Sequence, residues 1–128
     1  MIKSEQQKNR TLKILAESNK KLENLDEFLK GSMLSFVGTL EAEIEEYEAL
    51  KRGEFILPKN ISFVELLKNI AKVRISKGLS QQDFAKMLGV TKQQINRYEE
   101  HDYQNVSMAK ISEILDVLGL SVTLEKAA

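Results

Sequence analysis

The fold of this chain is decided by the stretch Gln81–Glu100, QQDFAKMLGVTKQQINRYEE. Its pattern predicts two short helices joined by a tight turn. In the first helix, Phe84, Ala85 and Leu88 fall on one face, and the small side chain of Ala85 lets a second helix come close. Gly89 follows at the turn, where a left-handed backbone conformation costs glycine least. The stretch therefore predicts a pair of packed helices with a short, fixed connection.

The second helix of the pair has a polar outer face. Thr91 is placed to cap its start, and Ile95 and Tyr98 form its inner stripe. The remaining side chains point outward and are of types that bond to purine edges or to phosphates. They are Lys92, Gln93, Gln94, Asn96 and Arg97. The pattern therefore favours a helix that enters a groove of DNA.

The region from about Leu66 to Leu118 resembles the Cro and phage-repressor-like helix-turn-helix family, often called the XRE family. GLSQQDFAKMLGV (residues 78–90), followed by TKQQINRYE (residues 91–99), carries the resemblance, because its small, apolar and glycine positions are in register with the family pattern. The resemblance implies a repressor-like helical domain and a sequence-specific DNA-binding transcriptional regulator.

The resemblance also implies roles for single residues. The positions at which the family reads bases are occupied by Lys92, Gln93 and Arg97, with Gln94 and Asn96 as neighbouring candidates. The positions at which it contacts phosphates, at the two helix starts, are occupied by Gln81 and Thr91. A partly buried ion pair of the family, with a structural role, is matched by Arg74 and Glu99. Any of the base-reading candidates could instead be an ordinary solvated helix residue.

The composition of the 128 residues is that of an ordinary globular protein, with 42% hydrophobic and 30% charged residues. The net charge is zero but unevenly distributed. Between Lys68 and Arg97 there are seven basic residues against one acid, whereas Glu41–Glu48 holds five glutamates and no basic residue. A neutral total thus combines a basic middle, which suits a nucleic-acid partner, with an acidic arm.

Several classes of protein are disfavoured by the sequence. No apolar run is long enough to span a membrane, and the polar start over residues 1–13 is unlike a signal peptide. The absence of cysteine excludes disulfides and thiolate metal sites and fits a reducing cytoplasm. A phosphate-binding glycine loop, a metal-ligand cluster and a nucleophile–base pair are all missing, so we expect no enzyme, no catalytic residue, no metal and no cofactor.

Residues 1–54 predict a helical arm that precedes the helix-turn-helix region. Leu15, Leu22 and Leu29 recur every seven residues, which predicts an amphipathic helix from Thr11 to about Leu29. Gly31 and Ser32 are expected to interrupt it before a second helix over about residues 33–52. The arm could pack as a hairpin on its own domain or on a second copy, or it could bind another protein such as a toxin.

Residues 55–61 contain the only proline and predict a linker, after which residues 62–128 form the DNA-binding domain. Ser62, Ser80 and Thr91 each precede, by three residues, a side chain that suits a capping box. Ser107 is expected to cap a fourth helix, whose apolar side chains recur with helical spacing. The capping residues therefore predict where the four helices of this domain begin.

The tail alternates apolar and polar residues, with Leu120, Val122 and Leu124 on one side, which predicts a short β-strand. A lone strand leaves its backbone groups unpaired, and no second strand is predicted. We therefore expect pairing with the same strand of a second subunit in a homodimer, the other option being a strand docked on its own domain. The ending LGLSVTLEKA also resembles that of antitoxin-type repressors, in which such a strand joins the dimer.

Together these features predict a mostly α protein with an N-terminal helical arm, a helix-turn-helix domain and a short C-terminal strand. The leading hypothesis is a homodimeric repressor that binds a palindromic operator in double-stranded DNA. An alternative is an antitoxin that neutralises a toxin through the arm and autoregulates its operon. A third hypothesis is an interaction protein that does not read bases, whose DNA binding would depend on salt but not on sequence.

Overall fold

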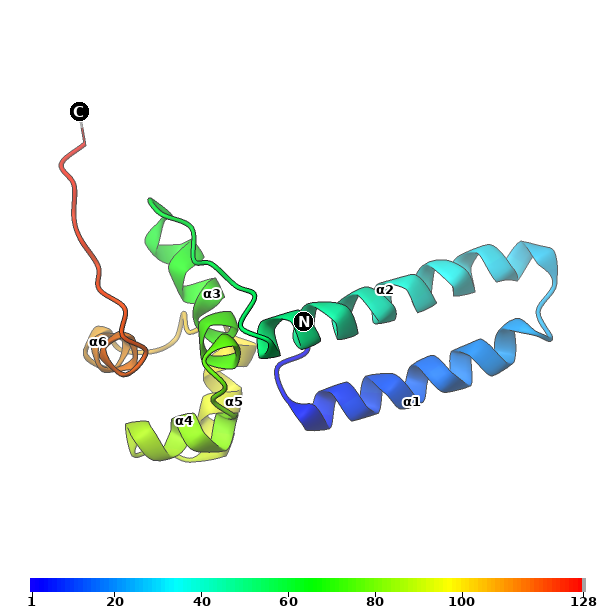
Figure 1. Ribbon diagram of the computed structural model, residues 1–128, viewed down its shortest axis with the longest axis horizontal. Helices are drawn as coiled ribbons and strands as arrows, with labels where there is room; N and C mark the ends of the chain where they lie inside the picture. The colour runs from blue at the N-terminus through cyan, green and yellow to red at the C-terminus, as the bar shows by residue number, and fades with distance from the viewer. Residues whose placement is uncertain (128) are drawn as a thin grey trace. The chain divides into compact units, whose positions relative to one another are not determined.

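The computed structural model describes residues 1–127 and is built of helices (Figure 1). The chain divides into two units, residues 1–55 and the residues from Ile56 onward. The first unit contains α1 (Glu5–Leu22) and α2 (Glu27–Lys51). The second contains α3 (Phe63–Ser76), α4 (Gln81–Leu88), α5 (Lys92–Glu100) and α6 (Met108–Val117). The prediction of a mostly α fold is therefore confirmed.

In the first unit, α1 and α2 run side by side in opposite directions (Figure 1). The buried apolar side chains of α2 are Val37, Leu40, Tyr47 and Leu50. Ion pairs join the two helices, because Lys8 Nζ lies 2.9 Å from Glu48 Oε1 and Lys51 pairs with Glu5. Pairs at the surface are worth about 0–1 kcal/mol each. The buried apolar stripe is therefore the main source of stability in this hairpin.

The prediction that Gly31 and Ser32 separate the two arm helices is wrong, because both residues lie inside α2. The first helix also lies earlier in the chain than predicted. The turn is fixed by Asp26, whose carboxylate accepts a hydrogen bond from the Leu29 N–H at 3.0 Å and caps α2. A glycine inside a helix costs about 1 kcal/mol. The packing of α2 against α1 offsets that cost.

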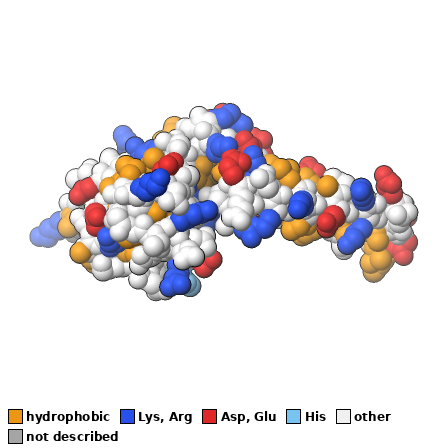
Figure 2. All heavy atoms as spheres, turned by 90° about the horizontal axis from the view of Figure 1, so that it is seen from below, with side chains coloured by type: hydrophobic (Ala, Val, Ile, Leu, Met, Phe, Trp, Pro, Cys, Tyr) orange, Lys and Arg blue, Asp and Glu red, His pale blue; other side chains and the backbone are white. Residues whose placement is uncertain are grey.

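The first unit keeps large apolar side chains on its surface, some of them visible in Figure 2. Phe28 is 90% exposed, and three more residues nearby in α2 are 45–56% exposed, namely Leu29, Leu34 and Phe36. We refer to these four residues as the arm patch. Apolar residues scattered singly are normal on a protein surface, whereas a contiguous apolar surface marks a protein-binding site.

In the second unit the core is formed by side chains with at most 2% exposure, including Ile70, Phe84, Ile95, Ile111, Ile114 and Leu118. Each of its four helices begins at a capping side chain that accepts a backbone N–H from three residues on, namely Ser62, Ser80, Thr91 and Ser107. At α4 the capping box is complete, because Asp83 Oδ2 accepts the Ser80 N–H at 3.1 Å. These caps fix the start of α4 and of α5.

The short β-strand predicted for the tail is not formed, since residues 120–127 have no regular secondary structure and residues 1–127 contain no strand. In the described tail the last backbone hydrogen bond runs from the Leu120 N–H to the Leu115 carbonyl, at 2.8 Å. A strand needs a neighbour that pairs with its N–H and C=O groups. No segment of the described chain supplies one, so Val122 and Leu124 remain 48% and 93% exposed.

Candidate nucleic-acid interface

The turn between α4 and α5 sets the position of the candidate recognition helix α5. Gly89 ends α4 in the left-handed conformation with φ of 68°, and the Val90 N–H bonds back to the Ala85 carbonyl at 3.0 Å. Phe84 and Ala85 are at most 1% exposed, and Ile95 of α5 is fully buried. Since both helices bury their apolar faces, the direction of α5 relative to α4 is fixed.

The outer face of α5 carries the polar side chains that the sequence singles out. Lys92, Gln93, Gln94 and Arg97 are exposed. Asn96 is half-buried, and its Nδ2 donates to Glu100 Oε1 at 3.3 Å. Lysine and arginine can bond to guanine O6 and N7, and glutamine can bond to adenine N6 and N7. The structure therefore brings two cationic and two amide side chains to the exposed face of α5. Asn96 already has a hydrogen-bond partner within the helix.

The two candidate phosphate contacts differ in their surroundings. Thr91 is exposed, and its Oγ1 accepts the Gln94 N–H at 3.1 Å, which caps α5. Gln81 is only 4% exposed, and its Nε2 donates to Glu99 Oε1 at 3.0 Å. The Gln81 side chain is therefore engaged in the interior of the domain.

A buried network lies behind the candidate recognition helix. Arg74 of α3 donates from Nε to Glu99 Oε2 at 2.8 Å and from Nη2 to Glu99 Oε1 at 2.9 Å, and both residues are 1% exposed. Arg74 also donates from Nη1 to the Leu79 carbonyl at 2.7 Å. This bidentate pair joins the end of α5 to α3 and to the α3–α4 turn.

The sequence does not predict that two further residues belong to this network. The Tyr103 hydroxyl donates to Glu99 Oε2 at 3.0 Å, and Gln81 donates to Glu99 Oε1. Tyr103 lies in the α5–α6 loop with φ of 58° and is 1% exposed, and its ring centroid is 5.9 Å from that of Tyr98. Burial, followed by the charge of Glu99, raises the Tyr103 pKa, so the phenol stays protonated as a donor. We refer to Arg74, Glu99, Gln81 and Tyr103 as the brace.

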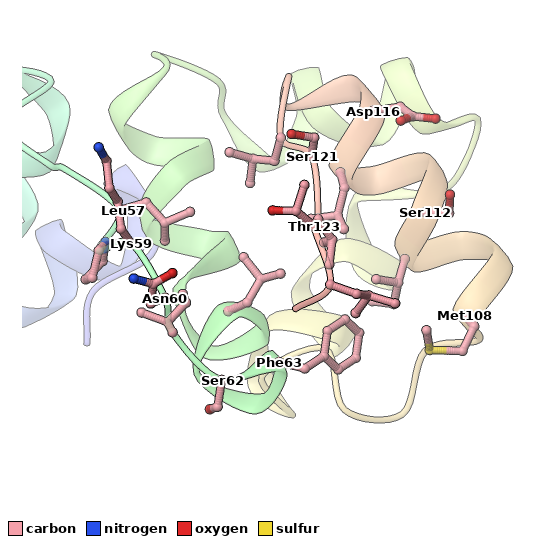
Figure 3. Close-up of a pocket in the computed structure, with 18 residues that line it drawn as sticks. Leu57, Lys59, Asn60, Ser62, Phe63, Met108, Ser112, Asp116, Ser121 and Thr123 are labelled. Atoms are coloured by element: carbon pink, nitrogen blue, oxygen red, sulfur yellow. The ribbon is translucent and has the colours of Figure 1, made fainter. Parts of the chain in front are cut away.

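The candidate dimer residues lie elsewhere in this unit. Leu120, Val122 and Leu124 line a groove of about 1050 Å³ whose other parts are residues 57–63, the start of α3 and α6 (Figure 3). We call it the tail groove. Leu66, Ile111 and Leu115 contribute apolar side chains to it, whereas α4 and α5 contribute none. The groove is therefore separate from the face of α5 that the sequence assigns to DNA.

Comparison with protein families found one match, to the helix-turn-helix model, over residues 70–124. No curated protein and no solved structure matched the chain. No helix in the described part of the chain is long and apolar enough to cross a membrane. The matched span contains α4, α5 and all four residues of the brace. The family is one of DNA-binding regulators, not of enzymes. Residues 70–124 therefore match the helix-turn-helix family of DNA-binding regulators of the XRE type.

Proposed function

We propose that this protein is a sequence-specific transcriptional repressor that binds a palindromic operator as a homodimer. The observation that carries the proposal is the outer face of α5, where Lys92, Gln93 and Arg97 are exposed on a helix whose opposite side is buried. Side chains held in this way can reach base edges in the major groove without any change of fold.

Within this proposal, Gln93 reads adenine, and Lys92 and Arg97 read guanine or contact phosphates. Gln94 is a secondary reader, and Asn96 can read a base through its second N–H and its Oδ1, because its bond to Glu100 uses only one N–H. Thr91 contacts a phosphate through its hydroxyl proton, because its oxygen already accepts the Gln94 N–H. At the start of α4 the contact comes from backbone N–H groups of the first turn, since the Gln81 amide is held by Glu99.

A dimer places two copies of α5 in successive major grooves, with half-sites about 34 Å apart. Repression follows if occupancy of such a site excludes polymerase. The basic run from Lys68 to Arg97 supports this assignment by attracting the DNA backbone. The charge of Arg74 does not contribute, because it is neutralised by Glu99 in the interior.

The proposal is tested by selecting bound sequences from random DNA with the full chain, and then measuring affinity for the selected site. Replacing Gln93 or Arg97 with alanine removes a bidentate contact worth about 1–3 kcal/mol, roughly a 5- to 150-fold loss of affinity. Lys110→Ala is the matched control, because that lysine lies on α6, outside the basic run, and pairs with Glu113 at 2.9 Å. Selection of no consensus, or equal affinity of all variants, would contradict base reading.

The antitoxin function remains a second proposal, and the arm patch is the observation that favours it. Phe28 is 90% exposed at the start of α2, so it suits an apolar partner surface. The test is co-expression with the product of a toxin-sized reading frame beside this gene, with Phe28→Ser as the variant that should weaken capture. If that product does not co-purify with the wild-type chain, the antitoxin role is rejected, while DNA binding is unaffected.

A further inference from the structure

The last residue of α5, Glu100, is an exposed acid on the helix that is proposed to enter DNA. It follows Gln93 and Arg97 at the spacing that places all three side chains on one face of the helix. A carboxylate is unfavourable there for two reasons, because it repels DNA phosphates and because it lies at the negative end of the helix dipole. Its contacts within the protein therefore indicate its role.

The Glu100 carboxylate accepts a hydrogen bond from Asn96, whose Nδ2 lies 3.3 Å from Glu100 Oε1. Within residues 1–127 Glu100 has no other hydrogen bond and no ion pair. Side chains of a helix lean toward its N-terminus, so a residue four positions later reaches back over Asn96. Asn96 is itself half-buried, which limits the space in which its amide can turn. The amide group is thus held on one side by Glu100.

This hydrogen bond determines which way round the amide of Asn96 lies. An ionised carboxylate can only accept hydrogen bonds, so Glu100 holds the NH₂ group and Oδ1 points away from it. One N–H is used by Glu100, which leaves the other N–H and Oδ1 for a ligand. In the major groove adenine presents its N6 amino group as a donor and N7 as an acceptor. The unused atoms of Asn96, one acceptor and one donor, are the complement of that edge.

We propose that Glu100 is a positioning residue, which holds the Asn96 amide in the orientation that reads adenine, an inference that rests on the proposed base reading by α5. Without the carboxylate the amide can turn end for end, and it then presents its NH₂ group where Oδ1 stood. In that orientation it can donate to guanine O6 or thymine O4. Glu100 therefore improves discrimination at one base pair and lowers the affinity for phosphates.

Replacing Glu100 with glutamine should change specificity and affinity in opposite directions. Glutamine can both donate and accept, so it no longer holds the Asn96 amide one way round. Immobilising one such side chain changes a binding constant about 2- to 12-fold, so the preference for adenine at the position read by Asn96 should fall by that factor. The affinity for DNA without this site should rise, because one negative charge is removed. A destabilised fold would lower both quantities.

The position read by Asn96 is identified first, by selecting sites from random DNA with the wild-type full chain and with Asn96→Ala. Competition binding then compares all four bases at that position for the wild type, Glu100→Gln, Asn96→Ala and the double variant. In the Asn96→Ala background, Glu100→Gln should no longer change the base preference but should still raise the affinity for unrelated DNA. Glu113→Gln on α6 is the matched control, because it removes the same charge from a carboxylate that pairs with Lys110 at 2.9 Å. It should change the preference at no position.

Several results would overturn the inference and leave the proposed function intact. If Asn96→Ala changes the preference at one position and Glu100→Gln leaves it unchanged, Glu100 does not position the amide. If Asn96→Ala changes no position of the site, Asn96 reads no base. If Glu100→Gln also lowers the preference at positions that Asn96→Ala leaves unchanged, Glu100 acts on α5 as a whole and not through Asn96. A wild-type chain that selects no consensus would instead reject base reading together with this inference.

Discussion

Replacing Glu99 with glutamine should destabilise the second unit more than any exposed change of charge. The carboxylate accepts two hydrogen bonds from Arg74, one from Gln81 and one from Tyr103. Glutamine keeps one oxygen and turns the other into an NH₂ group, which then faces two donors. The arginine also loses its counter-charge while only 1% exposed. Breaking a buried pair in this way costs about 3–5 kcal/mol.

This cost is large relative to the stability of the unit. About 70 residues at 0.05–0.15 kcal/mol each give a free energy of unfolding of roughly 4–11 kcal/mol. Tyr103→Phe removes a single hydrogen bond to a charged acceptor, so we expect about 1.5–3 kcal/mol. Glu100→Gln is the matched control, because the Glu100 carboxylate is next in the chain to Glu99 but is exposed. This substitution should change the free energy of unfolding by no more than about 0.5 kcal/mol.

The assay is native-state amide exchange of the Ile95 N–H in the full chain, which reports opening of the second unit independently of the arm. The expected order of destabilisation is Glu99→Gln, then Tyr103→Phe, then Glu100→Gln. If Glu99→Gln costs less than about 1 kcal/mol, or no more than Tyr103→Phe, the brace does not hold the end of α5 as described.

Two further predictions concern the backbone and the arm. Gly89→Ala should lower the free energy of unfolding, measured by thermal unfolding, by about 1–2 kcal/mol, because its φ of 68° is unfavourable for alanine even though no atom lies within 4 Å of the added Cβ. Gly38→Ala, equally uncrowded but inside the helix α2, should raise it by about 0.5–1 kcal/mol. Equal effects of the two changes would contradict this explanation. Hydrogen bonds from Lys51 and Lys8 lower the pKa of Glu5, and one from Lys8 lowers that of Glu48. The stabilisation of the hairpin by these carboxylates is therefore present above pH 4.5 and lost as the pH falls through their lowered pKa values. An NMR titration of both carboxyls should give apparent pKa values below 4.5, and values at or above it would contradict the pairing.

Local signals predict the fold of the second unit well. Ser62, Ser80, Thr91 and Ser107 each cap a helix, because a cap depends only on a side chain and the next three residues. The boundaries of the arm helices are less well predicted. Gly31 is a breaker by propensity, but the packing of α2 against α1 outweighs a cost of about 1 kcal/mol, and no short-range pattern contains that information.

The candidate site likewise contains some residues whose positions the sequence predicts and others whose positions it does not. Periodicity places Lys92, Gln93 and Arg97 on the outer face of α5, where the structure has them exposed. The position of Gln81 at a helix start suggests a surface residue, yet its amide points inward to Glu99. Tyr103 belongs to a loop without period, in which Asp102 and Tyr103 both have positive φ, and its hydroxyl donates to the same carboxylate. Such contacts depend on three-dimensional closure, which spacing along the chain does not encode.

The separation between the brace and the outer face of α5 has an evolutionary consequence. None of the four brace residues is among the exposed side chains Lys92, Gln93 and Arg97, and none of their hydrogen bonds described above involves those side chains. Under the proposed function, the DNA sequence that is bound can therefore change by exchange of these surface residues, while the brace that holds the helix stays the same. A substitution on this face leaves every hydrogen bond of the brace in place, so a change of specificity need not cost the stability of the fold.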